Sequence, residues 1–216
     1  MKQSNEEILE LLSYNPTAIR FIENPTEEML LSAVRYGYNV IKFIKNPSEK
    51  LQLESVKYYG SSIRYINEPS ENVQLAAVSE DGMVLEHIKN PSETVKLAAI
   101  RSSGHAIQFV DNPTEEMQLL SVNYEGTNIE HIKNPSDVVK LAAVKNSGWA
   151  IECIENPTEE MKLIAVKNRG AVITYIENPS TEVQLAAVFD EIVAMDSIDN
   201  LSIDVAEYVK MKIGLR

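Results

Sequence analysis

The chain has 216 residues, of which 44% are hydrophobic and 24% charged, and its formal net charge is −12. This composition is typical of a folded protein, and the acidic balance disfavours direct binding to nucleic acid. The single cysteine, Cys153, excludes an internal disulfide framework and a cysteine-based zinc cluster. The segment MKQSNEEILE lacks the pattern of a secretory signal, and no stretch approaches 18 uninterrupted apolar residues. We therefore expect a cytoplasmic protein without a membrane span.

A sequence repeat of constant length runs through almost the whole chain. Proline occurs at positions 25, 47, 69, 91, 113, 135, 157 and 179, a constant step of 22. Eight units therefore fill residues 25–200, and fixed periods of this kind indicate a solenoid. Residues 1–24 resemble a degenerate half repeat that caps the N-terminus. Residues 201–216 keep an amphipathic spacing through Val205, Val209 and Ile213, which predicts a C-terminal capping helix in one continuous domain.

Each unit opens with Asn-Pro-Ser/Thr followed in most cases by an acid, except that Glu68 replaces the asparagine of the third unit. With Asn46 as N-cap, Pro47 at the first helical position and Glu49 completing a capping box, this pattern predicts a helix that begins at the proline. A glycine follows six of the prolines at a constant offset, as Gly148 follows Pro135. We expect it to adopt the left-handed conformation and to end the first helix. A short second helix, for example Ala150–Glu155, should follow and be anchored by packing.

Three apolar columns predict the interface between neighbouring units. Leucine occurs at the same place in every unit, as at Leu141, and valine or isoleucine follows three places later, as at Val144. A small residue lies between them, as at Ala143, which allows helices to approach to about 8 to 10 Å. All three columns are expected to be buried.

Two units depart from the pattern. In the first unit the glycine is one place early, at Gly37, which predicts a locally altered turn. In the eighth unit Ile192 replaces the glycine, so residues 189–198 are expected to continue from the first helix without a clear break. In the half repeat, Pro16 occupies the corresponding position and predicts a firmer stop than glycine.

The motifs NPSETVKLAAI and NPTEEMKLIAV resemble leucine-rich repeat variant units and, more loosely, HEAT-type helical repeats. The resemblance covers residues 13–200. It implies an all-α, right-handed α-solenoid in which a long α-helix alternates with a short α or 3-10 helix, used as a binding scaffold without catalytic residues. The period of 22 rather than 24 and the internal glycine differ from that family. The units are also similar to Asn-Pro arrays of bacterial and phage proteins, which suggests an inhibitor or adaptor. The resemblance assigns no site residue.

The best candidate binding surface is the column to which Cys153 belongs, because surfaces of repeat arrays vary while the frame is held. Its members, with two residues expected on the same face, are Phe43, Tyr65, His87, Phe109, His131, Cys153 and Tyr175, together with His105 and Trp149. Two interpretations remain: the rings pack between repeats, or they form a partly exposed ladder that binds a protein or peptide. A second candidate is an acidic C-terminal end formed by Asp190, Glu191, Asp196, Asp199 and Asp204, which would suit a basic partner.

Other functions have weaker support in the sequence. A nucleic-acid mimic is conceivable for an acidic array, but a stacking step of about 10 Å is much longer than the phosphate step of about 3.4 Å. A small-molecule binder or enzyme could use His87 and His105, although no third metal ligand accompanies them. Known nucleotide-binding and protease motifs are missing from the sequence. We therefore expect a non-enzymatic scaffold that needs no cofactor, has no membrane partner, and binds a protein or peptide.

Overall fold

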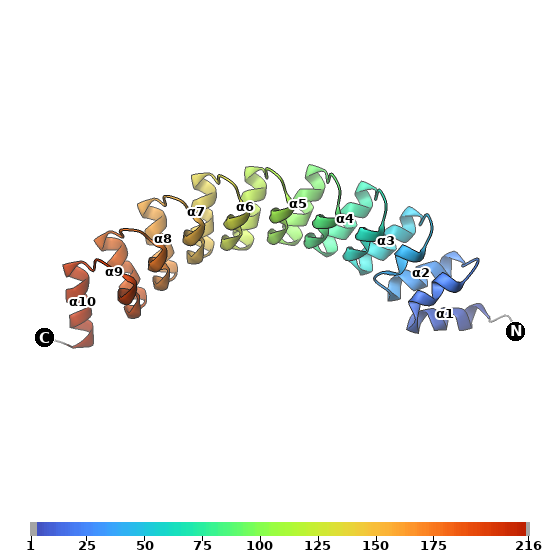
Figure 1. Ribbon diagram of the computed structural model, residues 1–216, viewed down its shortest axis with the longest axis horizontal. Coiled ribbons are helices and arrows are strands. Elements are labelled where there is room, and N and C mark those ends of the chain that lie inside the picture. Colours follow the sequence, from blue (N-terminus) through green and yellow to red (C-terminus); the bar gives the residue numbers. More distant parts are fainter. Residues whose placement is uncertain (1–3, 215–216) are drawn as a thin grey trace. The chain divides into compact units, whose positions relative to one another are not determined.

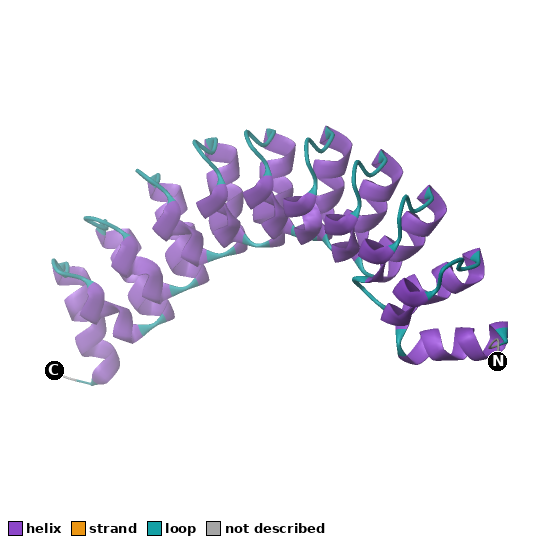
Figure 2. Ribbon diagram, turned by 45° about the vertical axis from the view of Figure 1, so that its right-hand side comes forward, coloured by secondary structure: helices purple, strands orange, loops and turns teal. Residues whose placement is uncertain are grey.

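The computed structural model of the protein describes residues 4–214, apart from the side chain of Ile213. The predicted role of Ile213 on the apolar face of the C-terminal capping helix therefore lies outside the described residues. The chain divides into two compact units, Met1–Phe109 and Val110–Arg216, which we call unit 1 and unit 2. Residues 4–214 form helices joined by loops and no strand (Figure 2). Among residues 4–214, none of the helices combines the length and the hydrophobicity that a membrane-spanning segment needs.

In unit 1, α-helices alternate with 3-10 helices, labelled η. Their bounds are α1 (Asn5–Tyr14), η1 (Pro16–Phe21), α2 (Glu27–Tyr36), η2 (Val40–Phe43), α3 (Glu49–Tyr58), η3 (Gly60–Tyr65), α4 (Glu71–Glu80), η4 (Gly82–His87), α5 (Glu93–Ser102) and η5 (Gly104–Phe109). Unit 2 continues the alternation. It contains α6 (Glu115–Tyr124), η6 (Gly126–His131), α7 (Asp137–Asn146), η7 (Gly148–Cys153), α8 (Glu159–Asn168), η8 (Gly170–Tyr175), α9 (Thr181–Asp190), η9 (Ile192–Ser197) and α10 (Ile203–Ile213).

Within each unit, every α-helix packs against the next α-helix, as Figure 1 shows for α2, α3 and α4, and in most repeats also against the 3-10 helices before and after it. The prediction of an α-solenoid of two-helix repeats with helical caps is thus confirmed, and the second helix is of the 3-10 type. The half repeat supplies α1 and η1, and α10 packs on α9 at the other end. The right hand of the superhelix stays a prediction.

The helices do not begin where the sequence suggested. The N-cap is the serine or threonine after proline, not the asparagine before it: the Ser48 hydroxyl accepts a hydrogen bond from the Leu51 N–H at 3.3 Å. Asn46 instead has φ of 48°, a left-handed conformation that asparagine tolerates better than most residues. The expected Asn46–Glu49 capping box is therefore wrong. Among the described α-helices the reciprocal pair occurs at Ser4 and Glu7 of α1.

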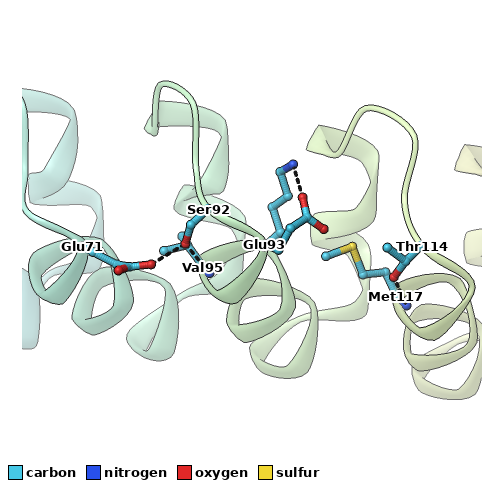
Figure 3. A network of polar contacts seen from close by, with 7 residues as sticks. Glu71, Ser92, Glu93, Val95, Thr114 and Met117 are labelled. Carbon is cyan, nitrogen blue, oxygen red and sulfur yellow. Dashed lines mark hydrogen bonds and ion pairs between the residues drawn. The ribbon is translucent and has the colours of Figure 1, made fainter.

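Glu49 lies at the first position of α3 and bonds the next repeat instead. The Ser70 hydroxyl, which caps α4, donates to its carboxylate at 2.5 Å. The same link joins Ser92 to Glu71 (Figure 3). It recurs in unit 2 between Ser136 and Glu115 and between Ser180 and Glu159. One residue pair therefore caps a helix and connects neighbouring repeats.

The glycines do not end the α-helices in a left-handed conformation. That expectation is wrong, because positive φ among the described glycines occurs at Gly214, beyond the repeats. The break is made by an extended residue one place earlier, such as Asp81 with φ of −146°. Gly82 then opens η4, where an added Cβ would lie under 3.0 Å from the Ala99 carbonyl oxygen of the next repeat. Glycine is required for this close approach between backbones.

The N–H groups of four of these glycines are bound by the end of the following α-helix. Their acceptors share one position of the repeat: Glu80 accepts from Gly60, Asn146 from Gly126, Asn168 from Gly148 and Asp190 from Gly170. These bonds satisfy backbone donors in the interface between repeats, where an unpaired N–H would be costly. The second helix consequently starts at the glycine, so η7 spans Gly148–Cys153 and not the expected Ala150–Glu155.

The core between repeats contains two of the three predicted columns. The small residues, such as Ala143, and the valines three places after leucine, such as Val144, are fully buried. The leucine column is only half-buried, as at Leu141, so that prediction is wrong. The residue two places before each leucine, such as Val139, takes the buried position. Ile151 and Ile154 are both buried and anchor η7 as expected.

The predictions for the two irregular repeats had different outcomes. In the first 22-residue repeat the early Gly37 shortens the second helix to Val40–Phe43, so the predicted local change is confirmed. Pro16 also opens η1 directly after α1 has ended. For the eighth repeat, the prediction of a continuous helix is wrong. There α9 ends at Asp190 and η9 begins at Ile192, with a break between them as in the other repeats. Ile192 is 39% exposed, so a side chain is accommodated where the other repeats need glycine.

Candidate functional site

The candidate site is formed by the last two residues of each 3-10 helix. We call this set of residues the edge surface. In η3 they are Arg64 and Tyr65, and they are flanked by the buried Ile63 and Ile66. The two isoleucines fix the helix end in the core, which leaves the pair between them directed toward solvent. Each repeat therefore presents two variable side chains to solvent at the same position.

The rings and polar groups predicted for this surface are partly accessible throughout. Phe43, Tyr65, His87 and Phe109 are half-buried, whereas His131, Cys153 and Tyr175 are exposed. None of these seven described residues belongs to the buried core. Within each unit these side chains therefore keep accessible edges at a repeating position.

In unit 1 a basic side chain separates successive rings of the edge surface. The Arg20 guanidinium lies 4.6 Å from the centre of the Phe21 ring and 5.6 Å from that of Phe43. The Lys42 ammonium lies 5.0 Å from the Phe43 centre and 5.5 Å from the Tyr65 centre. These distances allow cation–π attraction.

The Arg64 guanidinium continues the series at 5.9 Å from the Tyr65 ring. The cations and rings therefore alternate across three consecutive repeats. We call these six residues the cation–ring row; they are Arg20, Phe21, Lys42, Phe43, Arg64 and Tyr65.

Unit 2 carries a different combination, in which Trp149, the second residue of η7, lies beside the edge surface. Trp149 of η7 and Tyr175 of η8 meet edge to face with ring centres 5.9 Å apart, and Arg169 lies 5.2 Å from the Trp149 ring. The structure thus brings together two predicted site residues from successive repeats. Beside the rings, the place of Arg20 and Lys42 is taken by Glu130 and Glu152.

Open hollows lie next to the edge surface, and their charge differs between the units. In unit 1, a hollow of about 750 Å³ is lined by Arg64, His87, Lys89 and Glu68, with Gln74 and asparagines. In unit 2, a hollow of about 510 Å³ is lined by Tyr175, Glu177 and Asp199. Each hollow lies between neighbouring repeats, so the same fold provides a mainly basic recess in one unit and an acidic recess in the other.

The histidines and the cysteine lie on the solvent side of their helices. His87 ends η4, while His105 is the second residue of η5. His131 Nε2 lies 3.2 Å from the adjacent Glu130 carboxylate. Partial burial raises the pKa of the Cys153 thiol, and the nearby Glu130 and Glu152 carboxylates add to the increase. Within residues 4–214, no three His, Cys, Asp or Glu side chains are grouped so that they could hold a metal ion.

The five acids predicted at the C-terminal end are distributed over several elements. Asp190 ends α9 and its carboxylate accepts the Gly170 N–H at 2.8 Å, so it has a structural role. Glu191 is the extended residue between α9 and η9. Asp196 lies in η9, Asp199 lines the acidic hollow, and Asp204 lies in the first turn of α10.

Four residues of the cation–ring row were not predicted from the sequence to be site residues; they are Arg20, Phe21, Lys42 and Arg64. Arg20 and Phe21 belong to the half repeat, and Arg20, Lys42 and Arg64 lie one place before the aromatic column. The sequence did contain a signal for them. In the column one place before the aromatic column, the first three residues are all basic. The signal becomes interpretable once the 3-10 helix shows that both of its last residues face solvent.

Comparison with known proteins gives no match: no family model fits the chain, and no curated protein or solved structure is significantly similar to it.

Proposed function

We propose that the protein is a non-enzymatic repeat scaffold that binds a protein or peptide partner through the edge surface. The observation that carries the proposal is the partly exposed ladder of rings and polar groups on an otherwise regular frame. Aromatic and arginine side chains are the residues that most often dominate binding energy at protein interfaces. Here they occur in successive repeats and are already held in place by their neighbours, which reduces the entropy lost on binding.

The test compares co-purification of partners with two matched triple variants. Tagged protein is purified from its native host and the bound proteins are identified by mass spectrometry. The variant Tyr65→Ala/Phe109→Ala/Tyr175→Ala removes three rings of the edge surface. The control Tyr14→Ala/Tyr36→Ala/Tyr58→Ala removes three exposed tyrosines at the ends of α1, α2 and α3. Circular dichroism verifies that both variants keep their helical content.

We expect a stoichiometric partner that the control variant retains and the edge-surface variant loses. A typical central interface residue contributes about 1 to 2 kcal/mol or more, so three together should reduce affinity by more than 100-fold. The proposal is wrong if both variants retain the same partners, or if both lose them to the same extent.

A further inference from the structure

We propose that the cation–ring row of unit 1 is the docking site for an extended, acidic segment of the partner protein. This inference rests on the proposed function and adds the chemistry of the bound segment. The row crosses η1, η2 and η3 and ends at the hollow lined by Arg64, His87 and Lys89.

The three cations of the row are held in position without a carboxylate partner. Among residues 4–214, no ion pair forms at the cations of the row, Arg20, Lys42 and Arg64, whereas other cations of unit 1 such as Arg35, Lys50 and Lys96 do form one. Arg64 donates from Nε to the Ser61 carbonyl oxygen at 3.2 Å. The rings restrain the cations while leaving most of their N–H donors available. A carboxylate is the complementary acceptor, since guanidinium and carboxylate form charge-assisted hydrogen bonds.

The spacing of the row suits an extended peptide. Packed helices of neighbouring repeats lie about 8 to 10 Å apart, and three residues of an extended chain span about 10 Å. One acidic side chain in every three residues would therefore meet one cation in each repeat. The row covers three repeats, which corresponds to a segment of about nine residues.

The charges at the Arg64 end of the row define its limit. After Arg64 the next residue in the same column is Glu86, which ends the basic series. The hollow beside Arg64 is lined by Lys89 and His87 as well as by one acid, Glu68. A further acidic side chain of the segment would have two basic neighbours there.

Single-stranded nucleic acid fits the row less well, although it is also anionic. Proteins that bind it use ring faces as platforms on which bases stack. Here the Phe43 ring is approached by both Arg20 and Lys42, and the Tyr65 ring by both Lys42 and Arg64. The ring faces are therefore already used by cations. The net charge of −12 further opposes a long polyanion.

The experiment measures fluorescence anisotropy of a labelled peptide made of four Gly-Ser-Glu triplets, at low and high salt. The variant Arg20→Glu/Lys42→Glu/Arg64→Glu reverses the row. The control Lys133→Glu/Lys145→Glu/Lys167→Glu makes the same change in net charge with exposed lysines of unit 2. A third variant, Arg20→Gln/Lys42→Gln/Arg64→Gln, removes the charges while keeping polar side chains of moderate length. A Gly-Ser-Gln peptide and an oligothymidylate of equal length serve as alternative probes.

We expect saturable binding of the glutamate peptide that weakens at high salt. Both row variants should raise the Kd at least about tenfold, whereas the unit 2 control should change it less than about twofold, because its lysines are not part of the row and screening weakens any general effect of net charge. No binding of the glutamate peptide, equal effects of the two charge-reversed variants, equal binding of the glutamine peptide, or tighter binding of oligothymidylate through the row would each overturn the inference. Loss of the co-purified partner in the aromatic triple variant would still support the proposed function in those cases.

Discussion

The two units share one frame and differ in the chemistry that the frame displays. In both, a serine or threonine caps each α-helix, a buried small residue lies between repeats, and all but one of the 3-10 helices from η3 onward begin at glycine. The penultimate residue of the 3-10 helix is basic in the first three of unit 1, at Arg20, Lys42 and Arg64, and is then Glu86 and Gln108. In unit 2 the same position is never basic and includes Glu130, Glu152 and Asp196.

The net charge of the two units differs in the same direction, with unit 2 more acidic than unit 1. Residues 1–109 contain 11 Lys and Arg against 14 Asp and Glu, a net of −3, whereas residues 110–216 contain 9 against 18, a net of −9. Packing constrains the buried columns in every repeat, whereas the last two residues of each 3-10 helix are free to vary. The difference in charge between the units is an example of this variation. We infer that function in this protein is distributed unevenly along a uniform scaffold.

The largest expected effect tests whether both units need glycine at the close approach between neighbouring repeats. A Cβ added at Gly82 would lie under 3.0 Å from the Ala99 carbonyl oxygen, and one at Gly126 would lie equally close to that of Ala143. Backbone atoms cannot move aside without separating the repeats. We expect Gly82→Ala and Gly126→Ala each to lower the free energy of unfolding by about 3 kcal/mol, as measured by urea denaturation followed by circular dichroism.

Ile192→Ala provides the matched control, because position 192 already carries an exposed side chain where the repeat has glycine. It should change the free energy of unfolding by less than about 1 kcal/mol. Similar, small effects of all three substitutions would show that the close approach between backbones is unimportant. A large effect in one unit alone would show that the frame is not shared.

A smaller effect is expected at the serines that connect repeats. The Ser92 hydroxyl accepts the Val95 N–H at 3.3 Å and donates to Glu71 at 2.5 Å, and Ser136 does the same with Val139 and Glu115 in unit 2. Ser92→Ala and Ser136→Ala should each lower the free energy of unfolding by about 1 to 2 kcal/mol through loss of the cap.

Threonine is the natural alternative at this position, as at Thr114, whose hydroxyl accepts the Met117 N–H at 3.3 Å (Figure 3). Ser92→Thr should therefore stay within about 0.5 kcal/mol of the wild type. Urea denaturation again provides the measurement. If the threonine variant is as unstable as the alanine variant, the hydroxyl cap is not what stabilises this position and the prediction is wrong.

The repeat period and helical class could be predicted from the sequence because both follow from local patterns. Prolines at a constant step mark each unit, and the apolar stripe identifies its first helix. The errors concern backbone conformation. Asn46 and Ser48 are both good N-cap residues, so the sequence alone could not decide which one starts the helix. A glycine that is needed for close approach likewise looks the same as one that needs positive φ.

The candidate site could be predicted from the sequence less completely than the fold. The aromatic column was found, because large rings at a repeating surface position stand out against a regular frame. Arg20, Lys42 and Arg64 were missed, since each looks like an ordinary surface cation until its distances to the rings are known. The half-burial of Leu141 was missed for a related reason: an apolar residue can occupy either the centre or the rim of a helix interface.

The smallest expected effect concerns the one repeat junction of unit 1 that lacks asparagine. Glu68 has φ of 49°, whereas Asn134 occupies the same conformation in unit 2 with φ of 52°. Asparagine tolerates the left-handed region better than glutamate, because its short side chain can bond to the local backbone. Glu68→Asn should therefore raise the free energy of unfolding by about 0.5 to 1 kcal/mol, and Asn134→Glu should lower it by a similar amount.

This reciprocal pair also separates stability from binding. Glu68 lines the hollow beside the cation–ring row, but its replacement leaves Arg20, Lys42 and Arg64 unchanged and removes the acid that would repel a carboxylate. Glu68→Asn should thus stabilise unit 1 without weakening its affinity for the glutamate peptide, as measured by urea denaturation and fluorescence anisotropy on the same samples. A stabilised variant that loses peptide binding would mean that the Glu68 carboxylate itself contacts the bound segment, and the basic recess would then have to be redefined around it.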